Sequence, residues 1–117
     1  MVRLKEKLAE YIPQFHANIR SIVKEHGDKV ISQVTVAQAY GGMRGVKGLI
    51  CDTSLVEADT GLIIRSIPIL ELTDKLPEEI LWLLLTGELP DKDSLASLQN
   101  DLKQRAEVPS YVWGVLK

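Results

Sequence analysis

The sequence predicts a mainly α-helical protein with one small β-hairpin near residues 49–65. Three observations support this fold class. Apolar residues recur every three or four positions over residues 4–23, which is the period of an amphipathic helix. Two short apolar runs, residues 49–55 and 62–65, flank a segment of turn composition and predict two paired strands. A further apolar, helix-like run begins at Pro77.

The first predicted helix extends from about Leu4 to His26, with Lys, Glu and Arg opposite its apolar stripe. Pro13 either kinks this helix or starts a second one, because proline lacks the amide hydrogen that a helix interior requires. We expect Gly27 to end the helix in the left-handed conformation that glycine readily adopts.

Short elements are predicted in the middle of the chain. Thr35 is a suitable cap for a brief helix that runs into Gly41. Residues 57–61 have the composition of the hairpin turn. Helical structure is expected to resume over residues 67–72.

The C-terminal part is predicted to be helical. Pro77 suits the first position of a helix that Gly87 ends, and Trp82 in this apolar run is expected to be buried. The next helix places four residues on one face: Leu95, Leu98, Leu102 and Ala106. A last helix is expected to start at Tyr111, with Trp113 as a core residue. Because the chain stops inside this segment, we expect it to be a piece of a longer protein.

The composition excludes several classes of function. The 117 residues are 45% hydrophobic and 26% charged, which favours a folded chain over a disordered one. A net charge of −2 argues against broad affinity for DNA, RNA or anionic lipid. No apolar run approaches the roughly 20 residues of a membrane span. We therefore expect neither a nucleic-acid partner nor a membrane partner.

The number of cysteines and the N-terminal residues indicate the cellular compartment of the protein. Cys51 is the single cysteine, so the chain can form neither an internal disulfide nor a multi-cysteine zinc site. The charged start, with Glu6 and Glu10, lacks the apolar core of a secretory signal and fits poorly with a transit peptide. These features predict a cytoplasmic protein.

The strongest local signal is the glycine-rich segment of residues 41–48, in which four of eight residues are glycine. Glycine lets the backbone curve, and Arg44 and Lys47 add positive charge. This combination favours an anion site, and phosphate is the anion that we expect. The alternative is a tight connection whose two basic side chains simply face solvent.

This segment differs from two known phosphate-binding motifs and matches a third in spacing only. A P-loop requires Ser or Thr after Gly-Lys, whereas Gly48 follows Lys47. A dinucleotide fingerprint follows a strand and opens a helix, whereas this segment precedes a predicted strand. The Gly-x-x-Gly clamp of KH-type RNA-binding proteins does match residues 42–45, so RNA binding stays open as a weaker alternative.

The remaining reactive side chains form no recognisable site. His16 and His26 lie ten positions apart, without a carboxylate or cysteine at ligand spacing. Neither a metal site nor a catalytic dyad is therefore predicted. Cys51 lies in a predicted strand and is expected to be a small buried apolar residue. We predict no catalytic residue and no metal ligand in this chain.

Specific short segments follow one another along the chain in a set order. They are Val34-Thr35-Val36, Tyr40 to Leu49, Asp59-Thr60-Gly61, Ile64-Arg65, Ser66-Ile67-Pro68, Leu76-Pro77, Trp82 to Pro90 and Val108-Pro109-Ser110. In this order they resemble the citrate synthases, in the branch that includes the mitochondrial enzymes. Trp82 to Pro90 is similar to the family's Trp-Leu-Leu-x-Thr-Gly-x-x-Pro segment. The resemblance spans nearly the whole chain.

The resemblance implies that residues 1–117 are the N-terminal part of the family's large helical domain, without the small domain. It implies an acyltransferase of the tricarboxylic acid cycle, a homodimer that condenses acetyl-CoA with oxaloacetate and releases citrate and CoA. In the family an aspartate base and two histidines perform this chemistry, and they lie beyond position 117. This piece alone is therefore expected to be inactive. No cofactor is implied besides acetyl-CoA as substrate and CoA as product.

The resemblance carries over one site residue. Arg44 matches the arginine of the family's Gly-Gly-Met-Arg-Gly loop, which helps bind a CoA phosphate in the active site of the opposite subunit. Lys47 is a second, weaker contact. The family usually has Arg-Gly-Tyr after the second strand of the hairpin. Here Ser66-Ile67 follow Arg65, so the exit from the hairpin is expected to differ.

Alternatives to citrate synthesis stay open. A 2-methylcitrate synthase or a citryl-CoA-cleaving enzyme is a close variant of the same chemistry. A non-catalytic interaction or regulatory module could retain this region of the family without its catalysis. A downstream sequence containing two histidines and an aspartate would favour the enzyme over the module.

Overall fold

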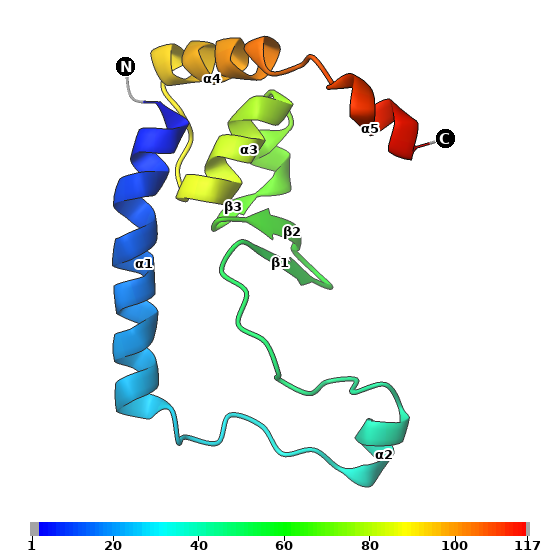
Figure 1. The fold of residues 1–117 in the computed structure, drawn as a ribbon. Coiled ribbons are helices and arrows are strands. Elements are labelled where there is room, and N and C mark those ends of the chain that lie inside the picture. Colours follow the sequence, from blue (N-terminus) through cyan, green and yellow to red (C-terminus); the bar gives the residue numbers. More distant parts are fainter. Residues whose placement is uncertain (1–2, 117) are drawn as a thin grey trace.

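The computed structural model describes residues 3–116, and helices dominate it (Figure 1). Within this range the α-helices are α1 (Leu4–His26), α2 (Val36–Tyr40), α3 (Pro77–Thr86), α4 (Lys92–Gln104) and α5 (Ser110–Val115). Between α2 and α3 in the sequence lie β1 (Ser54–Glu57), β2 (Gly61–Ile64), β3 (Ile67–Pro68) and the 3-10 helix η1 (Ile69–Leu72). The predicted fold class, mainly α with one small hairpin, is confirmed.

Helix α1 is a single helix that passes through Pro13 without a break. The interpretation of Pro13 as the start of a second helix is therefore wrong. Gly27 follows the helix with φ −57° and ψ −30°, and its amide donates to the Val23 carbonyl at 2.8 Å. This bond continues the helical pattern for one more residue, so the predicted left-handed cap is also wrong.

The small sheet is antiparallel, with the strand order β1-β2-β3. Glu57 pairs with Gly61, which leaves a three-residue turn, and Ser54 pairs with Ile64. The predicted turn is confirmed, but the first strand begins at Ser54 and not at Leu49. The turn determines the register, and the chain bends away after Ile64, so residues 49–53 have no partner strand.

Residues 67–72 differ from the predicted helix. Ile67 and Pro68 form β3, and only Ile69–Leu72 turn into a short 3-10 helix. The residue before a proline is disfavoured in the α conformation, which explains why the helix does not begin at Ile67. Pro68 lies on the edge strand, the place in a sheet where proline is tolerated.

The core lies where the sheet meets α3. Ile64, Leu72 and Leu83 form one buried cluster, and Leu83 is 0% exposed. Trp82 is 2% exposed, as predicted, and Gly87 ends α3 with a left-handed φ of 85°. Trp113 is 55% exposed, so its predicted core role is wrong. Every buried side chain among the described residues lies between Ser54 and Gln104, which we call the core region.

Residues 27–53, which we call the arm, contrast with this packing. Figure 1 shows the arm leaving the end of α1, extending to α2 and returning to β1. No side chain of the arm is buried. The radius of gyration is 19.4 Å, whereas about 13 Å is typical of a compact domain of this length. The arm therefore projects from the core region.

Candidate functional site in the arm

The short helix α2 directly precedes the glycine-rich segment. Thr35 caps it, because the Thr35 hydroxyl accepts from the Gln38 amide at 3.2 Å. The Gln38 side chain completes a capping box by accepting from the Thr35 amide at 3.0 Å. The predicted cap and the brief helix up to Gly41 are confirmed. Local sequence alone explains this element, since none of its residues is buried.

Gln38 also connects α2 to the turn that follows. Its carbonyl accepts from the Met43 amide at 2.8 Å, and its side-chain amide donates to the Arg44 carbonyl at 3.4 Å. The Val46 amide then donates to the Met43 carbonyl at 3.1 Å. These bonds curl the chain around Arg44. Two of the amides that could have faced an anion are therefore used inside the turn.

Left-handed backbone conformations shape this turn. Gly42 has φ 77° and Gly45 has φ 73°, which glycine adopts without steric cost. Met43 has φ 61° between them, a conformation that a side chain with a Cβ disfavours. A Cβ added at Gly42, Gly45 or Gly48 would meet nothing within 4 Å. The first two positions therefore require glycine for backbone conformation and not for space.

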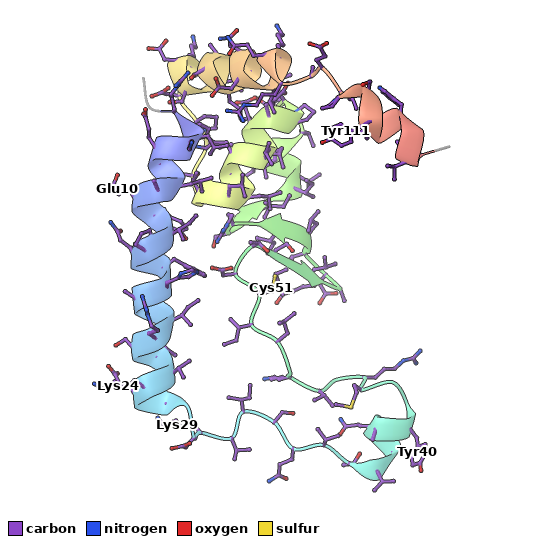
Figure 2. All side chains as sticks on the ribbon, in the orientation of Figure 1. Glu10, Lys24, Lys29, Tyr40, Cys51 and Tyr111 are labelled. Atoms are coloured by element: carbon purple, nitrogen blue, oxygen red, sulfur yellow. The ribbon has the colours of Figure 1, made fainter. Side chains whose placement is uncertain are left out.

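Arg44 and Lys47 are both exposed in this turn. Neither side chain forms an ion pair with a carboxylate within residues 3–116. Both cations are thus available to an external anion, and the Arg44 guanidinium can donate two parallel hydrogen bonds to phosphate oxygens. Tyr40, the last residue of α2, lies just before this turn and is labelled in Figure 2. Its side chain is also exposed, at 91%.

The other reactive side chains are not gathered around the arm's glycine-rich turn. His16 and His26 are exposed on α1. Among the described residues, no group of three or more His, Cys, Asp and Glu could hold a metal ion. Within the same range, no helix has both the length and the apolar character that crossing a membrane requires.

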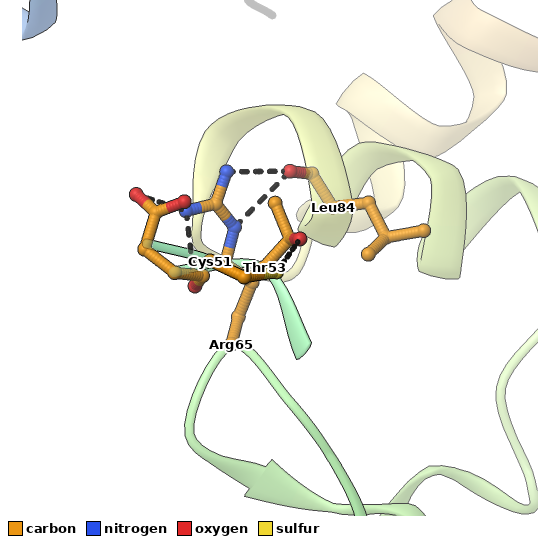
Figure 3. Close-up of polar contacts among 5 residues, drawn as sticks. Cys51, Thr53, Arg65 and Leu84 are labelled. Atoms are coloured by element: carbon orange, nitrogen blue, oxygen red, sulfur yellow. Dashed lines mark hydrogen bonds and ion pairs between the residues drawn. The ribbon is translucent and has the colours of Figure 1, made fainter. Parts of the chain in front are cut away.

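Cys51 is exposed, which corrects the expected burial. It lies before β1, outside any strand, because residues 49–53 have no strand to pair with. Its sulfur lies 3.2 Å from the Thr53 hydroxyl (Figure 3). Hydrogen bonding to the Thr53 side chain and then to the Ser54 and Thr53 backbone lowers the pKa of the Cys51 thiol to about 7.

Sequence reasoning did not identify the interactions of Arg65. Its guanidinium donates twice to the Leu84 carbonyl, at 3.1 and 2.7 Å, and pairs with the Asp52 carboxylate at 3.2 Å (Figure 3). The only signal in the sequence was a charged residue at the end of an apolar strand. Its partners are separated from it by 13 and 19 positions, so no local pattern could have found them.

A family model described as "Citrate synthase, C-terminal domain" matches residues 42–117, more than half of the chain. The match begins inside the glycine-rich segment. The placement of residues 1–117 in the N-terminal part of the large domain stays a prediction.

Curated relatives match almost the whole chain. "Citrate synthase, mitochondrial" of Saccharomyces cerevisiae is 42% identical over 119 residues, covering 93% of this chain and 25% of that protein. "2-methylcitrate synthase, mitochondrial" of Yarrowia lipolytica is 40% identical, with 93% and 26% covered. "Citrate synthase 4, mitochondrial" of Arabidopsis thaliana is 37% identical over 123 residues, with 97% and 26% covered. The chain spans about a quarter of the length of these relatives. Together with the family match, the alignments show that this chain belongs to the citrate synthase family.

Proposed function

We propose that the full-length protein is an acyltransferase that condenses acetyl-CoA with oxaloacetate and releases citrate and CoA. The observation that carries this proposal is the exposed Arg44 guanidinium, which forms no ion pair within residues 3–116. It lies on a left-handed glycine-rich turn in a chain of the citrate synthase family. Arg44 donates to a CoA phosphate, and Lys47 adds charge beside it. The proposed role of this chain is thus to bind the phosphate-bearing part of acetyl-CoA, and not to transfer protons.

The carbon–carbon bond chemistry belongs to residues outside this chain. The family resemblance assigns it to an aspartate base and two histidines beyond position 117. His16 and His26 are exposed on α1 and do not substitute for them. The 117-residue chain alone is therefore predicted to be inactive. Protein-dependent release of CoA from acetyl-CoA and oxaloacetate by the purified chain would contradict this prediction.

A 2-methylcitrate synthase is the second candidate, favoured by the relative from Yarrowia lipolytica at 40% identity. Its product carries one methyl group more than citrate, so its acyl donor must carry one carbon more. Steady-state assays of the full-length protein with oxaloacetate and either acetyl-CoA or propionyl-CoA separate the two. A pocket typically discriminates one methylene by about 10- to 200-fold in kcat/KM. We expect acetyl-CoA to be preferred. Inactivity with both donors would instead favour a non-catalytic module.

The homodimer and the compartment are further proposals. The arm exposes large apolar side chains, including Ile31, Leu49 and Ile50 at 67–86% exposure, and such surfaces mark contacts with other chains. Sedimentation analysis of the full-length protein should therefore show a dimer. The cytoplasmic location stays a prediction, because the three relatives are named as mitochondrial proteins. Imaging of a fluorescent fusion of the full-length protein would decide between the two compartments.

A further inference from the structure

Arg65 joins three parts of the chain that are distant in sequence. Its Nε and Nη2 donate to the Leu84 carbonyl near the end of α3. Its Nη1 lies 3.4 Å from the Asp52 carbonyl and 3.2 Å from the Asp52 carboxylate. Only 13% of the Arg65 side chain is exposed. Charge-assisted bonds of this kind are about twice as strong as bonds between neutral groups.

The backbone at the same place is unusual. Arg65 has φ 46° and Ser66 has φ 68°, two consecutive left-handed residues that are not glycine. This conformation is strained for a residue with a Cβ and persists only where surrounding contacts impose it. The Arg65 amide donates to the Thr53 carbonyl at 2.9 Å. Both the backbone and the side chain of Arg65 therefore hold Asp52 and Thr53.

Asp52 and Thr53 are the root at which the arm joins the sheet. The pairing of β1 begins only at Ser54, so the direction of the arm at this end depends on contacts outside the ladder. Arg44 lies eight residues before Asp52, a distance that the chain can span to at most about 26–29 Å. For a lever of at most this length, a change of direction of about 10° moves the tip by up to roughly 5 Å. Half that lever would still move the tip by about 2 Å, beyond the ~0.5 Å tolerance of a positioned binding group.

We propose that Arg65 is a positioning residue for substrate binding. By fixing Asp52 and Thr53 to α3, it sets the direction of the arm and raises the fraction of molecules in which Arg44 can reach the CoA phosphate. This inference rests on the proposed function. An apparent affinity falls in proportion to the fraction of competent molecules, so loss of the anchor should weaken acetyl-CoA binding and leave oxaloacetate binding unchanged.

The test uses Arg65→Lys and Asp52→Asn in the full-length protein. Lysine keeps the charge but cannot bond Leu84 and Asp52 through a planar fork. Each variant should raise the KM for acetyl-CoA by roughly threefold or more, with kcat and the KM for oxaloacetate within about twofold of wild type. In an Arg44→Ala background, Arg65→Lys should not raise the KM for acetyl-CoA further, because Arg65 affects this KM only by positioning Arg44. Arg105→Lys, on an exposed arginine at the end of α4, is the matched control.

A second readout does not depend on activity. Cys51 adjoins the root, and its pKa is lowered through Thr53 and Ser54. Release of the root by Arg65→Lys should raise the midpoint of the pH–rate profile for Cys51 alkylation, followed by mass spectrometry of the Cys51 peptide. Because lysine retains the positive charge, such a rise would report lost geometry and not lost charge.

Several outcomes would overturn the inference. An unchanged acetyl-CoA KM, an equal rise in both KM values, or a full Arg65→Lys effect in the Arg44→Ala background would each exclude positioning of Arg44. If the protein lacks condensation activity, the proposed function fails, and the Cys51 profile alone decides whether Arg65 anchors the root. An active protein with an unchanged Cys51 midpoint would leave the proposed function standing and refute the anchor.

Discussion

The core region and the arm are held in place by different forces. In the core region Ile64, Leu72 and Leu83 are buried against one another, and apolar burial stabilises them. In the arm no side chain is buried, and its contacts include the cap of α2, the hydrogen bonds of the glycine-rich turn and the bonds of Asp52 and Thr53 to Arg65. Burial of a full apolar side chain contributes about 1.5–3 kcal/mol, whereas a single cap contributes about 1 kcal/mol.

Because of this difference, we expect the core region to determine stability and the arm to determine substrate binding. The core region can tolerate little change, because closely packed side chains have no room to adjust. The arm carries Arg44 and Lys47, and exposed loops on a rigid scaffold are where binding groups commonly lie. Substitutions in the two regions should therefore change different measured quantities.

The largest effect is expected from Leu83→Ala. Leu83 is 0% exposed, and its truncation should lower the free energy of unfolding by about 2–5 kcal/mol, the range for buried leucines. Gln33→Ala, on an exposed polar residue of the arm, is the control and should change the free energy of unfolding by less than about 0.5 kcal/mol. Urea denaturation measures both. Equal destabilisation by the two variants would refute the distinction between the regions.

The second effect concerns binding. Arg44→Ala in the full-length protein should remove about 1–3 kcal/mol of acetyl-CoA binding, as expected for bonds between charged groups. Because the CoA phosphates are remote from the reacting methyl group, this loss should appear as a higher KM for acetyl-CoA with little change for oxaloacetate. Lysine at this position should restore only part of the loss. A KM that Arg44→Ala leaves unchanged across a range of salt concentrations would show that the turn is structural only.

A smaller effect is expected from the backbone of the turn. Gly45→Ala places a Cβ at φ 73° and should cost about 1 kcal/mol, or roughly a fivefold rise in the KM for acetyl-CoA. Gly48→Ala is the control, because Gly48 has neither a left-handed φ nor a neighbour within 4 Å. The KM of Gly48→Ala for acetyl-CoA should equal that of the wild-type protein. Similar kinetics for both variants would mean that the conformation at Gly45 does not shape the site.

The smallest effect is confined to one thiol. Thr53→Val removes the hydroxyl that contributes most to the lowered pKa of Cys51, so the pKa should rise from about 7 toward the ordinary value of roughly 8.5. The thiolate is the reactive form, and less of it would exist at neutral pH. The alkylation midpoint should therefore shift to higher pH, while the urea midpoint stays unchanged. Thr73→Val, on an exposed threonine in the core region, should leave the thiol unaffected.

Several elements whose signals lie within a few residues were predicted correctly. Thr35 caps α2, Pro77 begins α3, and Gly87 ends α3 with the expected left-handed turn. The hairpin turn, residues 58–60, lies within the predicted segment 57–61. In each case a cap, a proline or a glycine acts on its immediate neighbours, so the local sequence contains the whole cause.

Predictions that depended on distant partners were less successful. The strand expected from Leu49 begins at Ser54, because the register of β2 leaves nothing for residues 49–53 to pair with. Trp113 and Cys51 are residue types that are often buried in protein cores, yet both are exposed in this structure. Hydrophobicity predicts that a side chain can be buried, but a neighbouring surface must exist to bury it.

The sequence by itself determined the helical class, the hairpin, the glycine-rich turn with its two cations and the family resemblance, since each rests on local periodicity, spacing or residue order. Only the tertiary structure decided that the arm projects from the core region and that Arg65 joins Asp52 to Leu84. These features depend on groups separated by 13 and 19 positions. Side chains so distant in sequence meet only after the sheet and α3 have packed, so no local pattern encodes their contact.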